Sequence, residues 1–168
     1  MLCFTNMPEP YEEILDGVTL PRSAPGDRHE QICHRLHREM AASVAGLATT
    51  QLLPPRSKVQ VLRGTTICPD LALVTAASGK LFLAVEIVDR ADHHADTVVK
   101  KELYEKIRVP RLWMVDPRYD NIEIYHCTEF GLALQTILAG SELLTERLVP
   151  QFEITVTELF AAAPANGS

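Results

Sequence analysis

Residues 81–88 constrain the fold of this chain more than any other segment. They read Leu-Phe-Leu-Ala-Val-Glu-Ile-Val, so apolar side chains fall on both faces of an extended strand. Residues 112–115 form a second continuous apolar run. A strand that is apolar on both faces needs cover on both sides of its sheet, and helices provide this cover in α/β proteins. We therefore expect an α/β fold with a mixed β-sheet flanked by helices.

The pattern of the remaining segments agrees with this class. Asp27 and Glu30 have the spacing of a capping box and precede apolar residues at helical spacing, which predicts a helix over 28–47. A second helix is predicted over 96–108. An extended segment with a turn is expected at 11–20, and strands are expected at 58–62, 70–75, 81–88, 112–115, 122–126 and 132–138. The first three of these strands predict a meander, and the order α-β-β-β-α-β predicts one mixed sheet.

Length, composition and charge limit the possible functions. With 168 residues, 46% of them hydrophobic, we expect one domain over residues 1–160 and a disordered tail over 161–168. No apolar run is long enough for a membrane span and the N-terminus lacks a signal-peptide pattern, so we expect a cytoplasmic protein without membrane contact. The four cysteines form no CxxC pair, which argues against a zinc or redox motif. The net charge of −6 opposes tight non-specific DNA binding, but not an enzyme whose carboxylates hold a divalent cation.

Glu86 lies inside the apolar run, where an unpaired carboxylate would destabilise the fold. A three-residue loop at 77–79, with Gly79 in the left-handed conformation, would place Asp70 directly opposite Glu86, with Cβ atoms roughly 4.5–5.5 Å apart. Two carboxylates this close repel unless one is protonated or a divalent cation lies between them. An all-oxygen site favours Mg²⁺ or Mn²⁺.

Lys100 is the third candidate residue. At 3.6 residues per turn it lies on the shoulder of an apolar helix face that includes Val98 and Leu103, whereas Lys101 faces water. Its ammonium group could therefore reach the sheet while its stem covers apolar surface. The alternative from spacing alone is an ion pair with Asp96, four residues earlier.

These residues lie in segments that resemble the Uma2 family, a former domain of unknown function (DUF820) placed among the restriction-endonuclease-like PD-(D/E)xK proteins. The resemblance covers nearly the whole chain. The matching parts are 13–17, His29, 69–74, 83–88, 96–100, Tyr104, Val109, 113–117, 124–125, 150–154 and 158–160. The resemblance implies a restriction-endonuclease-like core and hydrolysis of phosphodiester bonds in nucleic acid, with DNA as the expected substrate.

The resemblance also implies roles for single residues. Asp70 and Glu86 correspond to ligands of Mg²⁺ or Mn²⁺, and the Ile87 carbonyl corresponds to a further ligand. The lysine that usually follows the second acid by two positions is replaced by Val88, and Lys100 stands where this family places it instead.

Glu13 corresponds to an additional acid that would approach the same metal ion or hold the lysine. Lys100 would orient the attacking water or stabilise charge on the phosphoryl oxygens. The sequence departs from the family pattern at 89–91, where Asp-Arg-Ala replaces a Ser-Pro-Ser-like stretch.

Three functions are compatible with these observations. The first is a metal-dependent endonuclease. The second is a catalytically silent module with the nuclease fold that acts by association, as a homodimer. The third is a hydrolase that uses Cys33 with His34 or His37, although neighbouring helix positions point apart and no orienting acid has suitable spacing.

A few further residues have more than one interpretation. His29 either faces the metal pocket from the start of the first helix or is an exposed residue of its first turn. Arg56, Lys58 and Arg63 could contact phosphates, but three charges within eight residues usually form a solvated surface. Trp113 is expected in the core because its strand is apolar throughout.

Overall fold

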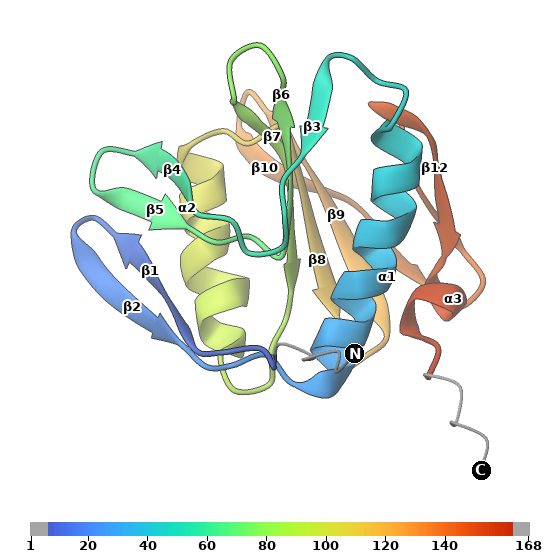
Figure 1. Ribbon diagram of the computed structural model, residues 1–168, viewed down its shortest axis with the longest axis horizontal. Helices are drawn as coiled ribbons and strands as arrows, with labels where there is room; N and C mark the ends of the chain where they lie inside the picture. Colours follow the sequence, from blue (N-terminus) through green and yellow to red (C-terminus); the bar gives the residue numbers. More distant parts are fainter. Residues whose placement is uncertain (1–6, 163–168) are drawn as a thin grey trace, which may run out of the picture.

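A six-stranded sheet forms the centre of the structure, a computed structural model that describes residues 7–162 (Figure 1). Strands β7 and β8 pair in parallel, and the other neighbouring strands of this sheet pair antiparallel. The sheet is therefore mixed, as predicted. In spatial order its strands are β10 (Gly131–Ala139), β9 (Asn121–Thr128), β8 (Arg111–Asp116), β7 (Leu81–Ile87), β6 (Leu71–Thr75) and β3 (Thr50–Leu52).

Helices cover both faces of this sheet (Figure 1). Helix α1 (Asp27–Val44) packs on one face. The π-helical turn η1 (Ala95–Lys100) and helix α2 (Lys101–Lys106) cross between β7 and β8 on the other. Trp113 is fully buried in the core on the α1 side, which confirms its predicted place, and Tyr104 is buried on the α2 side. No helix among residues 7–162 has the length and apolar character needed to cross a membrane.

The hairpin of β6 and β7 has the predicted register at the candidate acids, but it reaches that register in a different way. Leu71 faces Val85 and Leu73 faces Leu83, a pairing that continues to Asp70 and Glu86 just beyond β6. The loop spans residues 76–79 and is one residue longer than predicted, because the Thr75 N–H bonds to the Lys80 carbonyl. An irregularity between Leu73 and Val74 then leaves Phe82 as an extra residue on β7, which restores the register. Gly79 adopts φ +68, as the loop prediction requires.

A second sheet lies beside the central one, and it contains a strand that was predicted to belong to the meander. Its strands, in spatial order, are β2 (Val18–Arg22), β1 (Tyr11–Leu15), β5 (Thr65–Ile67) and β4 (Val59–Leu62). The strand predicted at 58–62 belongs to this sheet, and β3 takes its expected place next to β6. The predicted mixed sheet is present, but the prediction that the strand at 58–62 joins it in a three-strand meander was wrong. Pairing of β5 with β1 decides this arrangement, and no local pattern encodes that contact between distant segments.

The C-terminal segment packs against α1, an arrangement that the sequence patterns did not predict. Strands β11 (Leu143–Glu146) and β12 (Val149–Thr155) pair with each other, and helix α3 (Val156–Phe160) follows. Apolar side chains of β12 and α3 share the α1 core, including Phe152 and Leu159. Of the tail predicted to be disordered, residues 163–168 lie outside the described residues.

Candidate active site

Strand β7, turn η1 and strand β1 bring Glu86, Lys100 and Glu13 into direct contact. The Lys100 Nζ lies 2.5 Å from Glu86 Oε1 and 2.7 Å from Glu13 Oε1. All three side chains are buried, Lys100 completely. Burial opposes the charged form of the lysine, but the two carboxylates raise the pKa of Lys100 above its ordinary value. The ammonium group therefore stays protonated between two acids.

The π-helical turn η1 explains why Lys100 points inward. A π-turn holds more residues than an α-helical turn, so it shifts the angular position of each side chain. Asp96 and Lys100 form the buried face of this turn, whereas Val98, predicted to be buried, is 41% exposed. The predicted α-helical phase was therefore wrong at this point. The alternative, an ion pair between the described residues Lys100 and Asp96, is not formed. Asp96 instead accepts a hydrogen bond from Arg22, and Lys100 contacts Glu13 and Glu86.

Arg22 of β2 ties the N-terminal sheet to this cluster. Its guanidinium donates to Glu13 Oε2 at 2.7 Å and to Asp96 Oδ1 at 2.6 Å. The backbone N–H of Cys68 donates to Glu13 Oε1 at 2.7 Å. Two donors from different segments thus fix the carboxylate that contacts Lys100. The sequence left two roles open for Glu13, approaching the metal ion or holding the lysine. The structure shows Glu13 in contact with the lysine.

Tyr104 of α2 is a second partner of Glu86. Its buried hydroxyl donates to Glu86 Oε1, and burial together with the nearby carboxylate raises the pKa of Tyr104, so the hydroxyl remains a donor. No hydrogen bond from a described residue reaches Glu86 Oε2. Burial and the charge of Asp70 raise the pKa of Glu86 to about 8 in spite of Lys100. The carboxyl group of Glu86 is therefore hard to ionise without a further positive charge beside it.

Asp70 lies directly before β6 and is held by three groups. Its Oδ2 accepts the Ile87 N–H at 2.8 Å and lies 3.3 Å from His29 Nε2, and its Oδ1 lies 3.4 Å from a terminal nitrogen of Arg56. Burial opposes ionisation, but His29 and the Ile87 N–H lower the pKa of Asp70. Because Ile87 directly follows Glu86 in β7, this hydrogen bond holds Asp70 beside Glu86 across the hairpin.

The charges of the buried cluster do not balance. Four buried carboxylates face two buried cations, and the half-buried pair of Arg56 with Glu30 adds no net charge, so with a neutral His29 full ionisation leaves two negative charges uncompensated. A proton on Glu86 would remove one of these two charges, and a divalent cation would remove both. These residues are Glu13, Asp70, Glu86 and Asp96 against Arg22 and Lys100.

The donor set fits a hard divalent cation with an incomplete protein shell. Among residues 7–162 no group of three or more His, Cys, Asp or Glu side chains is arranged to hold a metal ion. Mg²⁺ commonly takes one or two carboxylates and completes its shell with water and substrate oxygens. Asp70 and Glu86 are two buried carboxylates of the kind that such a shell uses.

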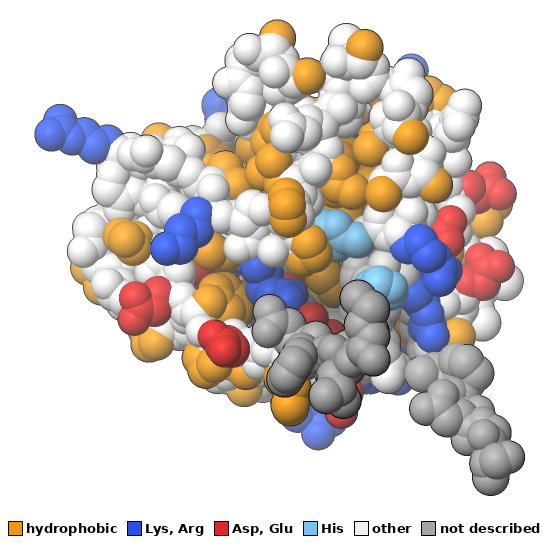
Figure 2. All heavy atoms as spheres, in the orientation of Figure 1, with side chains coloured by type: hydrophobic (Ala, Val, Ile, Leu, Met, Phe, Trp, Pro, Cys, Tyr) orange, Lys and Arg blue, Asp and Glu red, His pale blue; other side chains and the backbone are white. Residues whose placement is uncertain are grey.

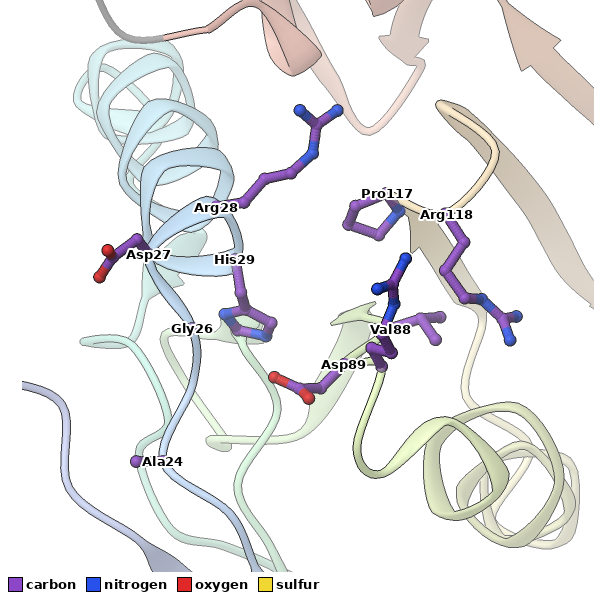
Figure 3. Close-up of a pocket in the computed structure, with 10 residues that line it drawn as sticks. Ala24, Gly26, Asp27, Arg28, His29, Val88, Asp89, Pro117 and Arg118 are labelled. Atoms are coloured by element: carbon purple, nitrogen blue, oxygen red, sulfur yellow. The ribbon is translucent and has the colours of Figure 1, made fainter.

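A cavity of about 500 Å³ is lined by His29, whose ring also contacts Asp70 (Figure 3). His29 points into it from the first turn of α1, and Asp89 faces it from the segment after β7 (Figure 3). Arg28 and Arg118 line the same cavity. The four predicted site residues do not line it and are at most 2% exposed. On the face drawn in Figure 2, histidine and arginine side chains lie over α1, whose sequence contains no lysine.

One expectation about a polar residue was wrong, one alternative is resolved, and the cysteine hydrolase loses its support. Arg56 is not a solvated surface residue, because its half-buried side chain contacts Asp70. His29 is buried and faces Asp70, which settles its two interpretations. Cys33 cannot act as an activated nucleophile, because burial raises the pKa of its thiol to about 12 and its Sγ donates to the Asp70 carbonyl. His37 contacts the same carbonyl through Nε2 at 2.7 Å.

Sequence reasoning missed Arg22, Tyr104 and His37 as members of the cluster. Tyr104 was visible only as a residue matched by the family resemblance, and Arg22 and His37 carried no local signal. All three act through side chains that meet the site from segments remote in sequence.

The fold and the buried acid–lysine cluster define a restriction-endonuclease-like α/β protein. The sequence profile of the Uma2 family, described as a putative restriction endonuclease, matches residues 2–157, and the chain belongs to this family. No curated protein matches the chain.

A solved structure supports the fold assignment. The chain is similar to a putative nuclease of the DUF820 family from Anabaena variabilis ATCC 29413, with a TM-score of 0.75 and 12% sequence identity. The similarity covers 91% of each chain. At this identity the likeness shows the fold, and the activity has to be argued from the site.

Proposed function

We propose that this protein is an endonuclease that depends on Mg²⁺ or Mn²⁺ and hydrolyses phosphodiester bonds of nucleic acid, with DNA as its substrate. The observation that carries the proposal is the contact of Lys100 Nζ with Glu86 Oε1 at 2.5 Å, next to Asp70 across the hairpin. Two acids and a lysine at these places are the residues that the PD-(D/E)xK resemblance requires. Membership of a family described as a putative restriction endonuclease supports the same conclusion.

Asp70 and Glu86 would hold the metal ion, together with the Ile87 carbonyl. A bound divalent cation polarises the phosphate and lowers the pKa of a bound water. Hydrolysis consumes one water: its oxygen joins the phosphorus, the bond from phosphorus to one sugar oxygen breaks, and that oxygen takes up a proton. Glu13 and Tyr104 keep Lys100 and Glu86 in a fixed orientation around this reaction.

A cleavage assay tests the proposal. Wild type would be compared with Asp70→Asn, Glu86→Gln and Lys100→Met on linear and supercoiled DNA with Mn²⁺, Mg²⁺ or EDTA. The exposed helix residue Glu102 offers a matched control, Glu102→Gln. We expect cleavage by wild type and Glu102→Gln with metal and a loss of at least 100-fold in the three site variants. Equal traces of cleavage in all preparations would indicate contamination and reject the proposal.

One observation favours the second candidate, a silent binding module that acts as a homodimer. Glu13, Asp70, Glu86 and Lys100 are at most 2% exposed, so access to the acids is narrow in this structure. Calorimetric titration with Mn²⁺, with and without DNA, separates the two functions. A protein that binds no divalent ion under either condition, and that is dimeric by light scattering, would support the silent module.

A further inference from the structure

Arg56 differs from the other cations of the buried cluster in its access to solvent. Lys100 is completely buried and the Arg22 side chain is 3% exposed, whereas the Arg56 side chain is 17% exposed. Lys100 also has two carboxylates as close partners, so it could contact a phosphate only by leaving them. Arg56 is the cation of this cluster that incoming substrate can meet first.

The backbone and one acidic partner hold Arg56 in a fixed position. Its φ of 54 is in the left-handed region, which is unfavourable for a residue with a side chain. Its N–H donates to the carbonyl of Pro69, the residue before Asp70, at 3.1 Å. Glu30 of α1 binds two terminal nitrogens of the guanidinium at 2.8 Å and 3.0 Å. One hydrogen bond and one close ionic contact with Glu30 thus hold the guanidinium beside Asp70.

The guanidinium of Arg56 retains donors for a ligand. A guanidinium has five N–H donors, and the contacts with Glu30 and Asp70 involve the terminal nitrogens. The Nε makes no hydrogen bond to a described residue. The 3.4 Å contact with Asp70 is longer than the 2.8 Å contact with Glu30, so Asp70 is the weaker partner. A planar cation with spare donors matches the oxygens of a phosphate group.

From these contacts we infer that Arg56 is a catalytic residue that binds a non-bridging oxygen of the substrate phosphate, while Lys100 positions Glu86. The inference rests on the proposed nuclease function and deepens it by assigning the phosphate contact to a residue outside the acid–lysine motif. Arginine contacts of this kind stabilise charge on phosphoryl oxygens.

The experiment compares Glu30→Gln with the double variant Glu30→Gln/Arg56→Gln. Both lack the Glu30 charge, and the double variant removes the ion pair without leaving a buried unpaired charge. Arg56→Lys tests the need for a planar group, and Arg38→Gln, at an exposed arginine of α1, is the control for a lost surface charge. Each variant would be assayed for kcat and KM with Mn²⁺, and for binding of a fluorescent DNA oligonucleotide in Ca²⁺ over a series of salt concentrations.

We expect the double variant to have a kcat about 100-fold to 1,000-fold below that of Glu30→Gln. The slope of log affinity against log salt should fall by about one, because one phosphate contact is lost. We expect Arg56→Lys to keep the slope but lose about tenfold in kcat, and Arg38→Gln to behave as wild type.

Equal kcat and equal salt slopes for Glu30→Gln and the double variant, in a wild-type protein that cleaves DNA, would overturn the assignment of Arg56 alone. Wild-type protein that neither binds nor cleaves DNA would overturn the proposed function and this assignment together.

Discussion

Replacing Glu86 by glutamine should stabilise the metal-free protein, although Glu86 is proposed to be essential for activity. Glutamine has nearly the same shape, and its carbonyl oxygen can still accept the Tyr104 hydroxyl. It cannot ionise. The substitution therefore removes the free-energy penalty of keeping a carboxyl group in this buried acidic cluster.

The size of the effect follows from the pKa of Glu86, which is raised from 4.5 to about 8. Between these values the folded protein binds a proton that the unfolded chain has released, so the free energy of unfolding falls as pH rises. Each pKa unit corresponds to about 1.36 kcal/mol, which gives a penalty of about 3 kcal/mol at pH 7. We expect Glu86→Gln to recover about 1–3 kcal/mol at pH 7 and almost nothing at pH 4.5.

Urea unfolding in EDTA measures this difference. Trp113, the one tryptophan of the chain, is completely buried, so its fluorescence should report loss of the core. Glu102→Gln on the exposed face of α2 is the control and should change stability by no more than about 0.5 kcal/mol. A Glu86→Gln protein that is less stable than wild type at pH 7, or a gain that is the same at pH 5 and pH 8, would refute the reasoning.

Three further outcomes are expected. Lys100→Met should lower the free energy of unfolding by about 3–5 kcal/mol, because it leaves Glu13 and Glu86 buried without their shared cation; a urea titration that shows a loss below about 1 kcal/mol would contradict this. Mg²⁺ or Mn²⁺ should raise the melting temperature more at pH 8.5 than at pH 6, because the ion must displace the proton of Glu86, and a scanning-calorimetry shift that is larger at pH 6 would speak against the site. Gly79→Ala should cost about 1 kcal/mol by the same urea assay, since φ is +68 and the added Cβ meets nothing within 4 Å; an unchanged midpoint would argue against the turn conformation.

Local sequence patterns were sufficient to predict the central strand β7 and the placement of Asp70 opposite Glu86. A continuous apolar run identifies β7, and the carboxylate of Glu86 stands out within it because ionised groups are expensive inside an apolar strand. The opposition of Asp70 to Glu86 was predicted correctly, but by two errors that cancel. The loop is one residue longer than expected, and the irregularity near Phe82 compensates for it. A turn pattern alone does not encode such a compensation, because it depends on side-chain packing along the whole hairpin.

Residues whose role depends on distant partners could not be predicted in the same way. Arg56 looked like part of a charged surface loop, and only the packing of α1 beside the segment before β6 places it at Asp70. The inward direction of Lys100 depends on the π-helical turn, which an α-helical period cannot reproduce.

The sequence by itself determined an α/β fold, a central strand with a buried acid, and the residue types on which we base the proposed metal-dependent nuclease site. These features depend on local periodicity and on the energetic cost of burying charge, which act within a few residues. The tertiary structure decided which cations meet the acids: Lys100 is enclosed between Glu13 and Glu86, and Arg56 stands at the more open side next to Asp70. The physical reason is that a buried charge is stabilised by groups that surround it in space, and folding brings those groups from segments far apart in the chain.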